Sequence, residues 1–296
     1  MDRRDFVKKS GIVGLGIAAS PGILSSCSSE PWFEISLAQW SLHRALNKGE
    51  LKHLSFPETA KRDYGITAVE YVSSFFRGLE VDKNYVGELK KKTEYHGVTN
   101  VLIMVDGEGD LGSADASQRQ RAVENHQKWV EVAKFLGCHS IRVNARGPGG
   151  PEELAKTAAE GLRSLSEFAE PFDIGVIVEN HGGLSSNGAW LAQVMKTVNL
   201  PNCGTLPDFG NFNIGNGEVY DRYLGTKELM PFAKGVSAKS YDFDSEGNET
   251  TIDYEQMLRI VKKSGYRGYI GIEYEGNNLS EEDGIRATKK LLERLR

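Results

Sequence analysis

The sequence predicts a single α/β domain, folded as a (β/α)8 TIM barrel, behind an N-terminal export signal. From residue 34 onward, eight short β-rich runs alternate with eight helical patterns, and polar residues gather where the β-rich runs end. The rival fold, an open doubly wound sheet, typically carries a G-x-G-x-x-G loop after an early strand, and no such loop follows either of the first two predicted strands. A length of 296 residues is ordinary for one barrel.

Residues 1–27 are interpreted as a targeting segment. Arg3 and Arg4 lie in a stretch that resembles a twin-arginine signal, and the apolar residues 11–24 are too few to span a membrane. This stretch ends in Leu-Ser-Ser-Cys27, similar to a lipobox, so we expect an exported lipoprotein that is anchored to the membrane by lipid on the periplasmic face. An uncleaved N-terminal anchor is the alternative. Residues 28–296 contain no linker and form the predicted barrel domain.

The strands are predicted from short runs rich in β-branched and aromatic residues. In chain order these runs cover residues 35–42, 68–73, 100–105, 140–144, 175–179, 204–208, 235–239 and 269–274. Between them, apolar residues recur at spacings of three and four, which is typical of helices. The helical patterns cover residues 56–63, 85–96, 118–136, 152–170, 189–198, 227–234, 254–264 and 281–296. Gly97, Gly137 and Gly265 follow three of these helices, where a C-terminal cap favours glycine.

Charge and cysteine content exclude several classes of protein. The net charge is -5 and no long basic run follows the N-terminus, so we expect no nucleic-acid partner. Hydrophobic residues make up 39% and charged residues 26%, which is typical of a globular domain. Cys138 and Cys203 both adjoin apolar strand starts, so they are interpreted as core residues rather than as a disulfide framework.

In a barrel of this kind the active site lies at the C-terminal ends of the strands. The candidate side chains near those ends are Gln39, Trp40, His43, Glu70, Asp106, Glu108, Arg142, Asn144, Glu179, His181, Asp208, Asn211, Lys239, Asp242, Glu273 and Glu275. Because residues two apart share one face of a strand, Glu179 and His181 are expected to point the same way. Asp106 and Glu108 lie in a glycine-rich stretch without the spacing of a calcium-binding loop, and they are interpreted as loop acids.

Three acids from late strands, Glu179, Asp208 and Glu273, are expected to converge at the barrel mouth. Two like charges about 4 Å apart repel by roughly 4 kcal/mol at an effective dielectric constant of about 20. Either protons or a divalent cation must offset that repulsion. An oxygen-rich cage suits Mg²⁺ or Mn²⁺, and a nearby His181 extends the choice to Co²⁺ or Zn²⁺.

Four phrases in strand order resemble the xylose-isomerase-like barrel family of sugar isomerases and epimerases, whose superfamily includes endonuclease IV. They are Val-Ile-Val-Glu-Asn-His-Gly-Gly (176–183), Leu-Pro-Asp-Phe-Gly-Asn-Phe (206–212), Lys-Gly-Val-Ser-Ala-Lys-Ser-Tyr-Asp (234–242) and Gly-Ile-Glu-Tyr-Glu-Gly (271–276). The similarity runs over nearly all of residues 34–295. It implies that Glu179, Asp208 and Glu273 hold one divalent metal ion.

The sequence departs from this family at the fourth ligand. Members usually carry His-x-Lys-Asp on the seventh strand, whereas this chain has Ser237 where the histidine is expected. Serine is a poor neutral ligand, so three outcomes stay open. The site keeps three protein ligands plus water, or His181 joins them, or the metal is weakly bound or absent.

The resemblance implies proton transfer beside a sugar carbonyl, with a metal that stabilises the resulting enediolate as a Lewis acid. In the epimerases of the family, the glutamates on the fifth and eighth strands are both ligands and bases, and here these are Glu179 and Glu273. Lys239 is a candidate donor to a developing oxyanion, and His181 a candidate acid or base. The candidate substrate contacts are Trp40, Glu70, Arg142, Asn144 and Asn211, with Phe212 beside Trp40 as a further apolar wall.

Each candidate also has a structural interpretation. The two catalytic glutamates would form stabilising ion pairs if they faced Arg142 and Lys239. His181, which precedes two glycines, would cap a turn. Trp40 would fill the core, and Glu70 would satisfy a buried backbone group instead of a substrate.

Three rival functions stay open. A lyase or hydrolase of oxidised (keto) glycosides would begin with the same proton removal and continue by β-elimination. A non-catalytic sugar-binding lipoprotein would agree with the missing histidine ligand. A nuclease of the endonuclease IV type is disfavoured, because it uses a histidine-rich zinc cluster and only His43 and His181 lie near strand ends. The expected partner is therefore a sugar or keto-sugar, and a homo-oligomer is compatible with the family, whose members are often dimers or tetramers.

Overall fold

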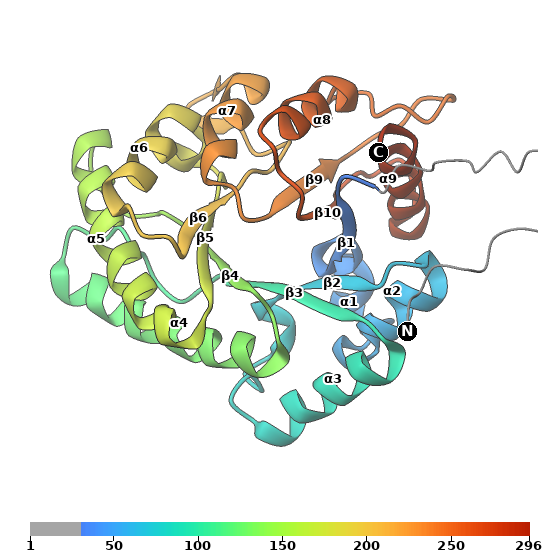
Figure 1. The fold of residues 1–296 in the computed structure, drawn as a ribbon, viewed down its shortest axis with the longest axis horizontal. Helices are drawn as coiled ribbons and strands as arrows, with labels where there is room; N and C mark the ends of the chain where they lie inside the picture. Colours follow the sequence, from blue (N-terminus) through green and yellow to red (C-terminus); the bar gives the residue numbers. More distant parts are fainter. Residues whose placement is uncertain (1–30) are drawn as a thin grey trace, which may run out of the picture. The chain divides into compact units, whose positions relative to one another are not determined.

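The computed structural model describes residues 31–296, so the predicted export signal lies outside the described residues. Eight parallel strands form one curled sheet in the order β6-β5-β4-β3-β2-β1-β10-β9, with the helices on its outer side (Figure 1). The strands are β1 (Glu34–Ala38), β2 (Ala68–Val72), β3 (Thr99–Met104), β4 (Ser140–Val143), β5 (Gly175–Glu179), β6 (Cys203–Leu206), β9 (Val236–Ser240) and β10 (Tyr269–Tyr274). The predicted (β/α)8 barrel is confirmed.

The two end strands of the sheet, β6 and β9, meet through single bridges rather than a regular ladder. Lys234 N donates to the carbonyl of Thr205 at 3.0 Å. Ser237 N donates to the carbonyl of Pro207 at 2.9 Å, and Phe209 N donates to the carbonyl of Ser237 at 3.1 Å. Proline has no N–H to donate, so it interrupts the ladder at this point. The barrel therefore closes at an irregular seam beside Asp208.

Each barrel strand is followed by a helix that packs against the sheet, and a short extra helix, α1, comes after β1. The helices are α1 (His43–Lys48), α2 (Phe56–Tyr64), α3 (Lys83–His96), α4 (Ala116–Leu136), α5 (Pro151–Ala169), α6 (Gly188–Val198), α7 (Arg222–Leu229), α8 (Tyr254–Lys263) and α9 (Glu281–Leu295). Gly97 and Gly137 close α3 and α4 at φ 61° and 83°, as predicted. Among residues 31–296, no helix has the length and apolar content needed to cross a membrane.

The first strand is shorter than the predicted range 35–42. It ends at Ala38, and the chain turns through a 3-10 helix, Gln39–Leu42, into α1. Side chains take over the bonds that a longer strand would make, because Gln39 Oε1 accepts from Val72 N at 3.1 Å and Ser41 Oγ donates to the carbonyl of Ile272 at 2.9 Å. Trp40 consequently lies on the 3-10 helix and His43 begins α1, so neither residue lies on a strand.

A two-stranded hairpin, β7 (Asn213–Gly215) and β8 (Glu218–Val219), lies between β6 and α7 and was not predicted. Its turn contains Asn216 and Gly217, both at positive φ (53° and 81°). Asn-Gly is the strongest short-range signal for a hairpin, so this element was readable from the sequence.

Candidate functional site

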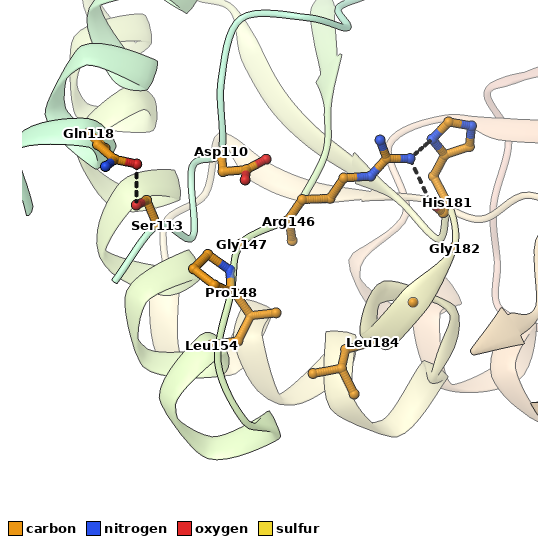
Figure 2. A pocket seen from close by; sticks show the side chains of 12 residues that line it. Asp110, Ser113, Gln118, Arg146, Gly147, Pro148, Leu154, His181, Gly182 and Leu184 are labelled. Carbon is orange, nitrogen blue, oxygen red and sulfur yellow. Dashed lines mark hydrogen bonds between the residues drawn. The ribbon is translucent and has the colours of Figure 1, made fainter. Parts of the chain in front are cut away.

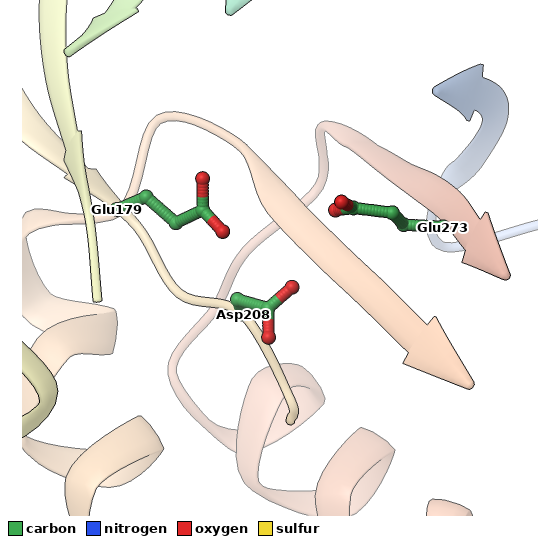
Figure 3. Close-up of side chains that lie close together, drawn as sticks. All are labelled: Glu179, Asp208 and Glu273. Carbon is green, nitrogen blue, oxygen red and sulfur yellow. The ribbon is translucent and has the colours of Figure 1, made fainter. Parts of the chain in front are cut away.

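The three predicted metal ligands meet at the C-terminal end of the barrel. Glu179 is the last residue of β5, Asp208 follows β6, and Glu273 lies near the end of β10. One carboxylate oxygen from each residue lies within 4.8 Å of the other two, and all three side chains are buried. Figure 3 shows the carboxyl groups directed toward one another. The sequence prediction that these acids converge thus agrees with the geometry.

Local bonds hold Asp208 in place where the ladder is interrupted. The amide of Asn180 donates to the carbonyl of Asp208 at 2.9 Å and accepts from its N–H at 2.8 Å. Asp208 Oδ1 accepts from the backbone N–H groups of Gly210 and Asn211, each at 2.8 Å. These bonds fix one carboxylate oxygen, so the other is directed toward the cluster.

Ser237 lies between two of the acids. Its Oγ is 2.7 Å from Asp208 Oδ2 and 2.8 Å from Glu273 Oε2. A hydroxyl group carries one hydrogen, so it donates to only one carboxylate at a time. The other carboxylate oxygen needs a proton or a cation to avoid an unfavourable contact between lone pairs.

A buried lysine lies on the other side of the same two acids. Lys239 Nζ is 3.3 Å from Glu273 Oε1, 3.8 Å from Asp208 Oδ2 and 3.3 Å from Glu275 Oε2. Glu275 also accepts a hydrogen bond from the indole N–H of Trp40, and the Trp40 ring stacks on the imidazole ring of His43. The sequence placed Glu275 near the site but did not indicate these two partners.

A buried arginine faces the remaining acid. Arg142 Nε lies 2.8 Å from Glu179 Oε2, but the two groups are not aligned as a hydrogen bond, and Oε2 has no hydrogen-bond partner among the described residues. Glu179 Oε1 accepts from Asn211 Nδ2 at 2.8 Å. The expected ion pairs of Glu179 with Arg142 and of Glu273 with Lys239 are therefore present. Glu179 Oε2 can still accept a hydrogen bond or bind a cation.

Arg142 and Lys239 do not fully compensate the negative charge of the three carboxylates. Burial raises the pKa of Glu179 to about 7 and the pKa of Asp208 to about 8, and nearby carboxylates add to both shifts. Burial is also the largest single effect on Glu273, but Lys239, the Ser237 hydroxyl and Arg142 together outweigh it and lower the pKa of that residue. Without another positive charge, the cluster would hold protons near neutral pH. Three carboxylates with surplus negative charge and an open oxygen fit a hard divalent cation.

Glu70 lies one layer below the cluster and is only 2% exposed. Its Oε1 accepts from Ser36 Oγ at 2.6 Å, and burial raises its pKa to about 8. A Cβ at Gly271 would lie 2.5 Å from the Glu70 carboxyl group, so glycine is needed on β10 at this level. Glu70 accepts from a hydroxyl rather than a backbone group, its other carboxylate oxygen has no hydrogen-bond partner among the described residues, and its role as a substrate contact stays a prediction.

Asp106 lies in the loop after β3, as interpreted, but it also contacts residues of the site. Asp106 Oδ1 lies 3.0 Å from Arg142 Nη1 and accepts from Asn144 Nδ2 at 2.7 Å. It thus shares Arg142 with the ligand cluster. Glu108, by contrast, accepts from the indole of Trp129 at 2.7 Å on the helical side of the loop. The interpretation of Glu108 as a loop acid agrees with that position.

Phe212 does not form the expected apolar wall with Trp40. Its side chain is fully buried, and a Cβ at Gly225 of α7 would lie 2.3 Å from its ring. Phe212 belongs to the core beneath α7, whereas Trp40 is half-buried at the mouth.

His181 lies beside the cluster but is not one of its ligands. Arg146 Nη2 donates to His181 Nδ1 at 2.8 Å (Figure 2). Asn144 Oδ1 lies 3.1 Å from the same nitrogen. In a neutral imidazole, Nδ1 either accepts from Arg146 or donates to Asn144, but not both. Because the contact with Arg146 is shorter, Nδ1 is the acceptor and the hydrogen lies on Nε2. Burial lowers the pKa of His181 to about 4, and Arg142 adds to the shift. His181 is therefore neutral near pH 7, and this geometry does not place it in the fourth ligand position.

The family model described as a xylose isomerase-like TIM barrel matches residues 59–295, in agreement with the resemblance of the four phrases. The chain is 42% identical over 66 residues to the C-glycoside deglycosidase alpha subunit of Arthrobacter globiformis. That alignment covers 21% of this chain and only 19% of the relative.

Solved structures share the fold over nearly their whole length. The 3-keto-D-glucoside 4-epimerase of E. coli aligns with a TM-score of 0.64 and 15% identity, over 88% of this chain and 98% of the other. The IOLI protein with a bound zinc atom aligns with a TM-score of 0.67 and 16% identity, over 88% and 97% of the two chains. At these identities the likeness establishes the fold alone.

Proposed function

Since this chain belongs to the xylose isomerase-like TIM-barrel family, we propose that it is a metal-dependent isomerase or epimerase that removes a proton beside the carbonyl of a sugar or keto-sugar. One observation carries the proposal. Three buried carboxylates face one arginine and one lysine, and Glu179 Oε2, although 2.8 Å from Arg142 Nε, has no hydrogen-bond partner among the described residues.

Glu179, Asp208 and Glu273 would hold one Mn²⁺, Mg²⁺, Co²⁺ or Zn²⁺ ion. Such an ion, when bound, supplies Lewis acidity toward a carbonyl oxygen and its neighbouring hydroxyl. The IOLI structure, which has the same fold, contains a bound zinc atom, and this supports a metal ion in the present barrel.

The remaining chemistry falls to the side chains. Glu179 and Glu273 approach from β5 and β10, so one carboxylate would accept the carbon-bound proton and the other would return one. Lys239 Nζ, already 3.3 Å from Glu273, would donate to the oxygen that gains charge. Asn211 and Arg142 are positioning residues, because each contacts one oxygen of Glu179.

A lyase or hydrolase that cleaves keto-glycosides is the second candidate, and the match to a C-glycoside deglycosidase alpha subunit favours keeping it. Proton removal would be the same, and the electron pair would then expel the group on the next carbon. The third candidate, a sugar-binding lipoprotein, requires the cluster to bind no metal. We further propose export to the periplasmic face by the signal in residues 1–27.

Metal analysis of the purified protein, followed by proton NMR of keto-sugars and keto-glycosides in D₂O, tests the proposal. We expect about one divalent ion per chain and solvent deuterium at the carbon beside the carbonyl. Glu179→Gln and Glu273→Gln should each slow exchange by about 10²–10⁴-fold. The control Asp173→Asn, which lies before β5 at the other end of the barrel, should not. Release of an aglycone would favour the lyase, and absence of both metal and exchange would leave only the binder.

A further inference from the structure

A separate open pocket of about 720 Å³ lies beside the carboxylate cluster at the same end of the barrel (Figure 2). This volume is within the range of about 300–1,000 Å³ that ligand sites span. Its walls come from the loops after β3, β4 and β5 and from the first turns of α4 and α5. Its lining includes Asp110, Gln118, Arg146, Leu154, His181 and Leu184. None of the three carboxylate ligands lines it.

The pocket is joined to the cluster by a short polar path. His181, in the pocket wall, follows Glu179 by two residues, which is roughly 7 Å along an extended chain. Asn144 lies between His181 and Asp106, with contacts of 3.1 Å and 2.7 Å. Arg142 then links Asp106 to Glu179. These contacts place the pocket next to the cluster.

The lining combines balanced charge with apolar surface. Asp110 and Arg146 contribute one carboxylate and one guanidinium, and Arg146 Nη2 donates to Nδ1 of His181 at 2.8 Å. Leu154 and Leu184 supply apolar area on the other side. A sugar ring has hydroxyl groups on its edge and C–H groups on its faces, so it matches both kinds of surface.

The backbone around the pocket is not arranged for an anion. His181 N already donates to Ser185 Oγ at 3.0 Å, and Gly182 N donates to Ser186 Oγ at 2.9 Å. The first turn of α5, where a phosphate would gain from the helix dipole, carries Glu152 and Glu153. A phosphate group would thus find few available backbone donors, and around the single guanidinium of Arg146 it would meet the carboxylates of Asp110, Glu152 and Glu153.

We propose that this pocket binds an uncharged sugar ring attached through a glycosidic bond to the reacting sugar. The substrate is then a disaccharide-like glycoside and not a free or phosphorylated monosaccharide. The inference rests on the proposed function for the reacting ring, while the pocket itself is tested by binding.

Variants that fill or strip the pocket test this inference. Leu184→Trp would occupy the pocket, and Gln118→Ala would remove a hydrogen-bonding group. Leu224→Trp, on α7 and already 46% exposed, and Gln120→Ala, on the same helix as Gln118, are matched controls outside the lining. The probes are one keto-sugar, its glucoside and its phosphate ester. Equilibrium binding is measured by calorimetry, and deuterium exchange gives kcat/KM.

We expect the wild-type protein to favour the glucoside over the free keto-sugar by at least about tenfold. Leu184→Trp should remove that preference and leave the free keto-sugar unaffected, while both control variants retain it. Equal affinity for the two sugars, or preference for the phosphate ester, would overturn the inference. If no sugar exchanges deuterium but glucoside binding is lost only in the pocket variants, the proposed chemistry fails and the pocket inference stands.

Discussion

Ser237 shows how one side chain sets the properties of the acidic cluster. Its hydroxyl lies within 2.8 Å of both Asp208 and Glu273 but has one hydrogen for the two of them. As a neutral oxygen it adds little to metal affinity, whereas the histidine usual in the family would add an imidazole nitrogen. The three carboxylates would then bind a metal with open positions for substrate oxygens.

Ser237→His is expected to tighten Zn²⁺ or Co²⁺ binding about tenfold or more, which corresponds to about 1.4 kcal/mol or more. The gain would come from a fourth protein ligand at the position that the hydroxyl now occupies. Titration of the purified protein against a competing chelator measures the change. Ser237→Ala is the matched control, because it removes the hydroxyl and adds no ligand. An unchanged affinity in Ser237→His would show that the metal, if bound, does not lie next to residue 237.

At the scale of whole elements, close packing of α5 on the loop after β3 shapes the site. A Cβ at Gly161 would lie 2.0 Å from the backbone oxygen of Leu111. Thr157, one turn earlier on α5, donates to the carbonyl of Gly112 at 2.7 Å, and Gly112 N donates to the carbonyl of Arg146 at 2.7 Å. Helix and loops thus form one connected unit around the pocket.

Gly161→Ala is expected to lower the free energy of unfolding by about 1–3 kcal/mol, because the added methyl group meets backbone that cannot rotate away. This loss should exceed the gain of up to about 1 kcal/mol that alanine brings to a helix interior. Urea unfolding measures the difference. Gly87→Ala in α3 is the control, since nothing lies within 4 Å of the position that its methyl group would take, and it should raise stability by about 0.5–1 kcal/mol. Equal effects of the two substitutions would contradict the packing argument.

For the barrel as a whole, the seam between β6 and β9 is the least regular junction. Asp208 comes from one side of this seam and Glu273 from beyond the other, with Ser237 on β9 between them. A metal ion held by these acids would therefore link the two sides of the seam, in addition to its role in the reaction.

Metal addition should slow amide hydrogen exchange at Ser237 and Phe209, whose N–H groups bond across the seam. At a metal concentration of about 100 times Kd, global stability should rise by about 2.7 kcal/mol. Exchange mass spectrometry with and without Mn²⁺ measures the first effect, and thermal unfolding the second. Asp208→Asn should abolish both, while amides between β2 and β3 stay unchanged. Metal-induced protection spread evenly over all strands would argue against a clip at the seam.

Much of the fold follows from local pattern. Strand and helix periods place eight β/α units in order, and in a closed parallel barrel every strand ends at the same mouth, so Glu179, Asp208 and Glu273 were expected together. The predicted end of the first strand, residue 42, was wrong because the side chains of Gln39 and Ser41 form hydrogen bonds with neighbouring strands. Such long-range bonds leave no trace in the local sequence pattern.

The linear order of residues thus specifies the barrel and the acids at its mouth, because alternation and topology act through neighbours in the chain. Folding decides how those acids are partnered. Asp106 meets Arg142 across 36 positions, and Trp40 meets Glu275 across 235. The pocket beside His181 likewise arises from three loops whose paths depend on packing. Contacts between distant segments depend on backbone paths in space, so they emerge only once the sheet has closed on itself.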